Sequence, residues 1–417
     1  MTEKDLYLKA ASRRLFWRMG FSTKVDVPLR AFVPNQRRAG QSRPKPPYEA
    51  FTDLDVLGIQ IAPDLRVQSV IADCKTSVKG STERMFWIRG VADFFAADDA
   101  YMVRAGDVTA ASRQLAARLG VGVLTPDDLA ALEGHYGAGL PAPDAVAGFL
   151  FDGPSIAAYR HAFTELDRRL HPLREYQEFD FWVYEEHRNL QQLVAHLSTV
   201  AKHLDPGHPV HQALFFESAW LYALSLARAV HHVRRTHVTD IDTSLREYVF
   251  GGQLGLREKQ HLAKVLRAAA GKEGGDPDEG VFPPYFAALL ELSSRFLRRP
   301  AHASTVLRYA EWASEAHVVR QASPAAEVFG ESFDDLAAKL LADVCGFLVS
   351  TAGLDSEFRA RARAVLAPAT LGAPETVASD TESGADKTPA SSGRSPRAQE
   401  SLPLDIDATS SQQDSSD

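Results

Sequence analysis

The sequence is poor in cysteine and in long apolar runs, and this excludes several classes of protein. Its 417 residues include two cysteines, Cys74 and Cys345, which lie far apart in apolar segments. Two such residues give no disulfide framework, so we expect a reducing, cytoplasmic environment. The first residues, MTEKDLYLKAASRR, hold no apolar core of signal-peptide length, and no run of about 18 apolar residues follows. We therefore expect a soluble protein that is not exported and has no membrane partner.

Several motifs of common enzymes are also missing. The sequence has no P-loop, G-x-x-x-x-G-K-[ST], so ATP use is not supported. It has neither G-x-S-x-G nor His-Glu-x-x-His, which are the motifs of α/β-hydrolases and of zinc proteases. His203, His208 and His211 are near one another in the sequence, but their spacing matches no established zinc-ligand pattern. We interpret these histidines as polar or helix-capping residues.

The net charge of −8 is unevenly distributed along the chain. Residues 1–50 hold 11 Lys and Arg against 4 Asp and Glu, whereas residues 371–417 hold 3 against 9. A basic segment of this kind suits contact with phosphates, because phosphates need cations for positioning. The alternative interpretation is an ordinary solvated, charged surface.

The most informative stretch is residues 52–75, TDLDVLGIQIAPDLRVQSVIADCK. It predicts two antiparallel strands, because two segments rich in β-branched residues flank a turn at Pro63-Asp64. If the turn is centred on Asp64, the numbers of opposed residues sum to 128. This register sets Asp55 opposite Asp73.

The same register sets Asp53 opposite Lys75, and all four charged side chains then share one face of the sheet. Two opposed carboxylates about 5 Å apart repel each other, so a cation must offset their charge. Lys75 supplies one positive charge. A divalent metal between Asp55 and Asp73 is the expected second.

Asp55, followed by Asp73-Cys74-Lys75 at the end of the next strand, resembles the PD-(D/E)xK nuclease superfamily. Its members carry an Asp on one core strand and (Asp/Glu)-x-Lys on the neighbouring strand. The segments LDVLG and ADCKT are most similar to type IV restriction enzymes and Holliday-junction resolvases. The resemblance covers about residues 1–133 and implies a restriction-endonuclease-like αβββαβ core that hydrolyses DNA with the help of a metal.

The proposed catalytic residues are Asp55, Asp73 and Lys75. Asp55 and Asp73 are expected to hold Mg²⁺, for which Mn²⁺ can substitute, while Lys75 orients or deprotonates the attacking water. Asp53 is a further ligand or a partner of Lys75. The alternative is a salt-bridged hairpin on the surface. The apolar residues on both faces of these strands argue against it, because they are expected of central strands.

The first helix is expected over residues 3–19, with Arg13, Arg14 and Arg18 off its apolar stripe. The resemblance implies an acidic residue on this helix, for which Glu3 and Asp5 are the candidates. Ordinary acidic residues at a helix N-terminus are the alternative interpretation.

Two groups of basic residues are candidates for binding the nucleic-acid backbone. One group lies in the Gly- and Pro-rich segment 35–48, which predicts a mobile loop, and the other lies on a helix expected over 81–97. The alternative for the loop is a solubilising insertion. The candidate residues are Arg37, Arg38, Arg43 and Lys45 in the loop and Arg84 and Arg89 on the helix.

The pattern along the chain predicts an α/β domain followed by an all-α domain. Strands alternate with helices in the first part, which favours a mixed central sheet with helices on both faces. Later apolar residues recur at helical spacing. The predicted divisions are 1–133 for the nuclease-like domain, 134–154 for a Gly-, Ala- and Pro-rich linker, 155–367 for the helical domain and 368–417 for a disordered acidic tail.

The sequence leaves three functions open. The first is a metal-dependent DNA endonuclease in restriction, defence or DNA repair, whose helical domain binds a target, a protein partner or a second copy. The second is a catalytically inactive DNA-binding or scaffold protein with the nuclease fold. The third is an RNase acting through the helical domain, because Arg295 and His302 resemble the Arg-x₄₋₆-His pair of the HEPN family.

Overall fold

The computed structural model describes residues 3–32, 48–76, 81–136, 144–183, 185–271, 278, 280–319 and 322–368. The chain divides into one compact unit, residues 1–369, and a second segment, residues 370–417. The predicted disordered tail therefore lies outside the described residues, apart from residue 368. The predicted basic loop lies outside them as well.

A five-stranded mixed sheet forms the first part of the compact unit. Its strands follow one another in sequence order across the sheet, with antiparallel pairing among the first three and parallel pairing from the third to the fifth. This confirms the prediction of a mixed sheet. The strands are β1 (Ser22–Phe32), β2 (Tyr48–Ile61), β3 (Val67–Lys75), β4 (Asp99–Arg104) and β5 (Gly122–Leu124).

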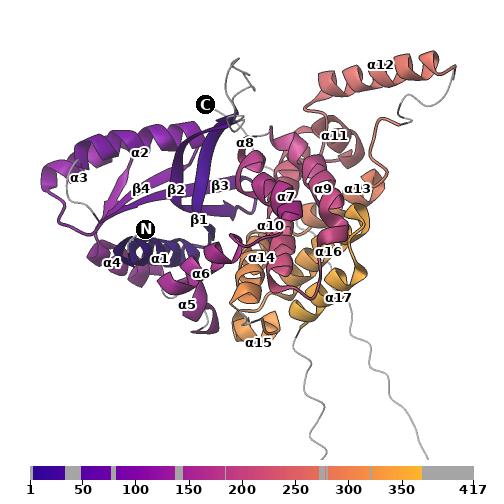
Figure 1. Cartoon of the computed structure of the whole chain (residues 1–417). Helices are drawn as coiled ribbons and strands as arrows, with labels where there is room; N and C mark the ends of the chain where they lie inside the picture. Colours follow the sequence, from indigo (N-terminus) through magenta and orange to yellow (C-terminus); the bar gives the residue numbers. More distant parts are fainter. Residues whose placement is uncertain are drawn as a thin grey trace, which may run out of the picture. The chain divides into compact units, whose positions relative to one another are not determined.

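Helices cover both faces of this sheet, as its alternating apolar pattern requires. Val56, Val70 and Ala72 pack on one face, and Leu57 and Ile71 pack on the other. Figure 1 shows the two layers of helices with the sheet between them. The first face is covered by α1 (Glu3–Arg18) and α4 (Pro126–Tyr136), and the second by α2 (Ser81–Phe95) and α3 (Ala110–Leu119).

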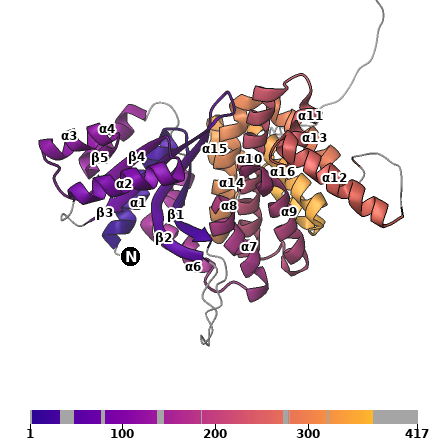
Figure 2. The ribbon, with the colours of Figure 1, turned by 90° about the horizontal axis from the view of Figure 1, so that it is seen from above.

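The second part of the compact unit is helical, as predicted. Figure 2 shows its longest helix, α10, among α9, α14 and α16. Helix α10 is long and apolar enough to cross a membrane, but 94% of its apolar window is buried by the rest of the protein, as expected for a helix in a protein core. The helices are α5 (Asp144–Leu150), α6 (Gly153–Ala162), α7 (His171–Glu175), α8 (Phe181–Val183), α9 (Asn189–Val200), α10 (Pro209–Thr236), α11 (Ile241–Tyr248), α12 (Gln253–Ala269), α13 (Phe286–Leu297), α14 (Ala303–Val318), α15 (Ala325–Phe329), α16 (Asp335–Ala352) and α17 (Ser356–Val365).

The segment predicted as a linker, 134–154, differs in the structure, because part of it is helical and buried. Val146, Phe149 and Leu150 of α5 are at most 1% exposed and belong to a core that contains residues of both the sheet and the helical part. Apolar side chains among the glycines and alanines of this segment supply that burial. The two parts therefore share a continuous apolar core.

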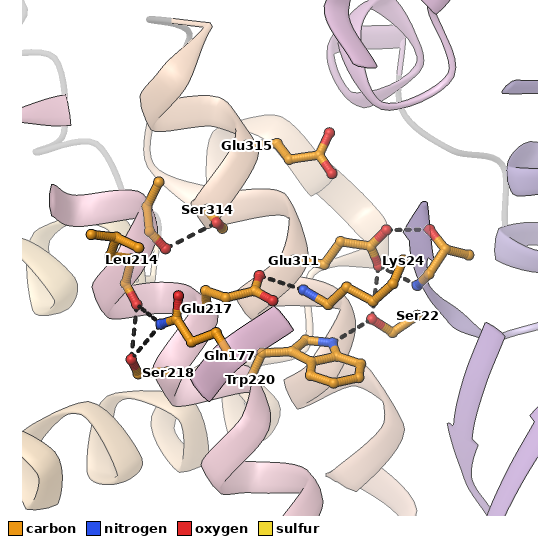
Figure 3. A network of polar contacts seen from close by, with 12 residues as sticks. Ser22, Lys24, Gln177, Leu214, Glu217, Ser218, Trp220, Glu311, Ser314 and Glu315 are labelled. Atoms are coloured by element: carbon orange, nitrogen blue, oxygen red, sulfur yellow. Dashed lines mark hydrogen bonds and ion pairs between the residues drawn. The ribbon is translucent and has the colours of Figure 1, made fainter. Parts of the chain in front are cut away.

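A buried polar network also joins the start of β1 to the helical part (Figure 3). Trp220 Nε1 on α10 donates to Ser22 Oγ at 2.7 Å, and Ser22 Oγ donates to Glu311 Oε2 on α14 at 2.8 Å. Lys24 forms an ion pair with Glu217 on α10. Buried polar groups of this kind need their partners, so the network fixes how β1 meets α10 and α14.

Candidate functional site

The register predicted for the central hairpin is confirmed. Strand β2 pairs with β3 from Val56 opposite Ala72 to Ile61 opposite Val67, and each pair of numbers sums to 128. The turn is closed by the backbone N–H of Ala62, which donates to the carbonyl of Arg66 at 2.9 Å. The strands therefore bring Asp55 and the end of β3 together, as the sequence predicts.

Asp55, Asp73 and Lys75 converge at this end of the hairpin. Lys75 Nζ lies 3.6 Å from Asp55 Oδ2 and 3.8 Å from Asp73 Oδ1. The backbone N–H of Cys74 donates to Asp55 Oδ2 at 2.8 Å, which fixes the orientation of that carboxylate. The three side chains proposed as catalytic thus lie on one side of two adjacent strands.

The two carboxylates are buried, whereas the lysine reaches solvent. Asp55 and Asp73 are 4% and 3% exposed, and the Lys75 side chain is 41% exposed. Burial raises the pKa of Asp73 above its ordinary value, against the lowering effect of Arg84, and the charge of Asp55 raises it further. The charges of Arg84 and Lys75 oppose this effect and lower the pKa of Asp73.

Arg84, predicted to bind a phosphate, is engaged with Asp73. Its Nε donates to Asp73 Oδ2 at 2.7 Å, and its Nη2 donates to Asp73 Oδ1. Its guanidinium also lies over the Trp87 ring, 3.4 Å from the ring centre. Arg89, the other candidate on α2, pairs with Asp93 one turn along the helix on the exposed surface.

Lys9 on α1 is a site residue that the sequence analysis missed. Its Nζ lies 2.7 Å from Asp55 Oδ1 and also forms an ion pair with Asp26. Burial alone would lower the pKa of Lys9, but the charges of Asp55 and Asp26 outweigh that effect and raise it. A lysine in a helical pattern is normally predicted to be exposed to solvent, so the sequence of α1 did not indicate this contact.

Asp26 is the second residue that was missed. It lies on β1 between the pairs Val25–Val56 and Val27–Leu54, and so faces Asp55 across the strands. Its φ of 56° is in the left-handed region, which a non-glycine residue rarely adopts within a strand. Such strained positions occur most often at functional sites.

Three of the acidic residues near the site, which do not include Asp73, form a cluster. One carboxylate oxygen each from Asp26, Asp53 and Asp55 lie within 4.8 Å of one another, and among the described residues this is the group of this kind that could share an ion. Arg160 of α6 forms an ion pair with Asp26. Asp26 and Asp55 are both paired with Lys9, so their charges are partly offset without an ion.

The donor set suits a hard divalent cation by its chemistry, since it consists of carboxylate oxygens. The oxygens are nevertheless engaged within the protein. Asp55 Oδ1 faces Lys9 and Asp55 Oδ2 accepts from Cys74, while both oxygens of Asp73 accept from Arg84. An ion bound by Asp55 and Asp73 would therefore have to replace Arg84 at Asp73.

A crevice of about 550 Å³ adjoins the acidic cluster. It lies between β1 and the helices that follow the sheet, and Asp26 and Asp53 line it together with basic and aromatic residues. The basic and aromatic members of the lining include Arg30, Arg160, Arg174, Tyr159 and Trp182. A polar crevice beside carboxylates gives a ligand room to reach them.

The remaining predicted residues are placed as follows. Glu3 lies in α1, but its side chain is outside the described residues, as are Arg37, Arg38, Arg43 and Lys45. Asp5, the alternative to Glu3, accepts a hydrogen bond from Thr76 Oγ1 at 3.0 Å, next to Lys75. Both cysteines are free and buried, as expected.

The pair proposed for an RNase is engaged with separate acidic partners. His302 Nδ1 lies 2.7 Å from Asp334 Oδ2, whereas Arg295 forms ion pairs with Glu291 and Asp343. Both pairings are of the ordinary kind that stabilises the ends and surfaces of helices.

When the chain was compared with protein-family models, curated proteins and solved structures, none of the three comparisons gave a match.

Proposed function

We propose that this chain is a metal-dependent endonuclease of PD-(D/E)xK type that hydrolyses phosphodiester bonds of DNA. The observation that carries the proposal is the convergence of Asp55, Asp73 and Lys75 from adjacent strands, with the ammonium 3.6 and 3.8 Å from the two carboxylates. The order of elements supports a restriction-endonuclease-like core: a helix, three antiparallel strands, a helix, a strand, a helix and a strand.

In this proposal Asp55 and Asp73 hold Mg²⁺, or Mn²⁺ in its place. The ion, when bound, polarises the scissile phosphate and lowers the pKa of the attacking water. Lys75 reaches solvent while remaining near both carboxylates, so its ammonium is placed to orient that water and to offset negative charge on the phosphate. Lys9 positions Asp55 from the buried side of the strand.

The charge and position of several segments support DNA as the substrate. The first 50 residues carry a net positive charge, which favours contact with a phosphate backbone, although Lys9, Arg13, Arg14 and Lys24 are paired with acids of the protein itself. The helical part meets β1 close to Asp26 and Asp53, so it is placed to contact the same substrate or to bind a protein partner or a second copy. The biological role that we propose for this activity is restriction, defence or DNA repair.

The test is cleavage of supercoiled plasmid by the purified chain with Mg²⁺. Lys75→Ala and Asp55→Asn should each lower the rate by about 100-fold or more, because each removes a group needed for the chemical step. Arg361→Ala is the matched control, since Arg361 is an exposed arginine paired with Glu357 within α17. Wild-type cleavage that persists in Lys75→Ala would refute the assignment of this site.

One observation favours a second candidate, a DNA-binding or scaffold protein without turnover. The oxygens of Asp55 and Asp73 are engaged by Lys9, Cys74 and Arg84, as in a purely structural ion-pair network. This candidate predicts a wild-type protein that binds a duplex but leaves the plasmid intact with Mg²⁺ or Mn²⁺. Fluorescence anisotropy with a labelled duplex, measured beside the cleavage assay, distinguishes the two.

A further inference from the structure

Arg84 blocks the position that a metal ion would take at Asp73. Two of its nitrogens donate to the two oxygens of that carboxylate, which is the bidentate geometry of strong Arg–carboxylate pairs. The guanidinium also stacks on the Trp87 ring, with Arg84 Cζ 3.4 Å from the ring centre. Arg84 is thus held in place by two independent contacts.

The two partners differ in their access to solvent. The side chain of Asp73 is 3% exposed, and a buried carboxylate is costly without a cation beside it. The side chain of Arg84 is 30% exposed and starts from a helix at the rim of the site. Arg84 can therefore turn toward a ligand in solvent, provided that another cation takes its place.

We propose that Arg84 exchanges between Asp73 and a phosphate of the DNA substrate, so that DNA and the divalent metal bind cooperatively. A phosphate offers Arg84 the same bidentate acceptor geometry that the carboxylate offers. When Arg84 moves to the phosphate, Asp73 is free for the metal, and a bound metal in turn releases Arg84 for the phosphate. By linkage, each ligand tightens the binding of the other by the same factor. This inference rests on the proposed nuclease function.

The experiment measures Mn²⁺ binding to the full chain by calorimetry, with and without a duplex oligonucleotide whose phosphorothioate linkages resist cleavage. In the wild type the duplex should tighten Mn²⁺ binding by about five-fold or more, the lower range of known couplings. Arg84→Ala should bind Mn²⁺ that much more tightly without DNA, and the duplex should then change its affinity less than about two-fold.

Two further variants keep the test decisive. Arg84→Lys keeps the charge but loses the bidentate pair, so its Mn²⁺ affinity without DNA should lie between those of the wild type and Arg84→Ala. It also replaces Arg84→Ala if that variant does not fold by circular dichroism. Arg361→Ala, from a surface pair on α17, should behave as the wild type.

The outcomes separate the exchange from the nuclease function itself. If Mn²⁺ binds the wild type and Arg84→Ala equally, with or without the duplex, the exchange is overturned, whereas cleavage that depends on Lys75 still supports a nuclease. If no variant binds Mn²⁺ under any condition, the metal site at Asp55 and Asp73 is refuted, and the proposed function falls with it.

Discussion

Lys9 Nζ lies 2.7 Å from Asp55 Oδ1, so helix α1 and the central strand β2 share a buried ion pair at the candidate site. Lys9 is also paired with Asp26 on β1. One ammonium thus joins three elements of the sheet region. It offsets two carboxylates that would otherwise repel each other in a medium of low dielectric constant.

We expect Lys9→Met to lower the free energy of unfolding by about 3 kcal/mol, because it leaves buried carboxylates short of a counterion. The loss should fall at the low end of the range for buried pairs, since Lys75 and Arg160 remain near Asp55 and Asp26. Urea denaturation measures the change. The exposed pair Arg89–Asp93 provides the comparison, and Arg89→Ala should cost about 1 kcal/mol or less.

The hairpin could be predicted from the sequence because its information is local. Alternating apolar residues and a Pro-Asp turn set the register, and the register sets which side chains are opposed. This is why Asp55, Asp73 and Lys75 were found together. Helix α3 is also limited by local features, since the Thr109 side chain accepts from the N–H of Ser112 at its start and Gly120 is left-handed at its end.

The contacts that the sequence did not reveal are those between distant elements. Lys9 was not singled out, Arg13 was placed off the apolar stripe of its helix, and Arg84 was predicted to bind phosphate. Each of them pairs with an acid from another element. Helical periodicity shows which face of a helix is apolar, but it does not show which buried acid of another element lies opposite a charged residue. Asp26 was missed for a different reason, since no pattern signals a left-handed residue within a strand.

Arg13 and its acidic partners should be essential for the contact between the sheet and the helical part. Arg13 is 1% exposed and donates to Glu311 Oε1 at 2.6 Å and to Glu315 Oε2 at 3.0 Å, both on α14. Arg13→Met should cost about 3–5 kcal/mol, because it leaves two buried carboxylates unpaired. Chemical denaturation measures this loss.

The control for Arg13 lies one residue further along the same helix. Arg14 pairs with Glu133 alone, and the two side chains are 35% and 9% exposed, so Arg14→Met should cost less than Arg13→Met, because it leaves one buried carboxylate without a counterion instead of two. Changing Glu311 and Glu315 to Gln in the Arg13→Met background should recover part of the stability, since these two side chains then carry no charge that needs Arg13. Equal losses for Arg13→Met and Arg14→Met would show that the buried network contributes no more than the single Arg14–Glu133 pair.

The raised pKa of Asp73 predicts a pH dependence of stability. A folded-state pKa above the ordinary 3.8 means that the folded protein binds the proton more tightly than the unfolded chain. The stabilisation from this group is complete below about pH 3.8 and is lost as the pH rises through the folded-state value. Relative to Asp73→Asn, the wild type should therefore lose stability over that interval.

Urea unfolding of both proteins from about pH 3.5 to about pH 7 measures this difference and cancels contributions that the two share. Since a proton and a metal compete for the same oxygens, Mn²⁺ binding should tighten as the pH rises through the same interval. A difference in stability that stays flat, or that rises with pH, would contradict the raised pKa.

Gly58 tests how tightly the site strand is packed. It lies on β2 opposite Val70, and a Cβ at this position would meet Val70 Cγ1 at 2.6 Å and side-chain atoms of Phe16 and Phe21 at 3.2 Å. Val70 is buried and β-branched, so its side chain has few alternative rotamers. We expect Gly58→Ala to cost about 1–3 kcal/mol through overpacking.

The comparison is Gly90, which lies in the middle of α2 with no atom within 4 Å of the added Cβ. Gly90→Ala should stabilise the protein by about 0.5–1 kcal/mol, because alanine loses less backbone entropy in a helix. Thermal and urea unfolding of the two variants should therefore shift in opposite directions. If Gly58→Ala is as stable as the wild type, β2 and β3 can separate slightly at this point, and the spacing of Asp55 and Asp73 three residues away is then less rigid than the packing implies.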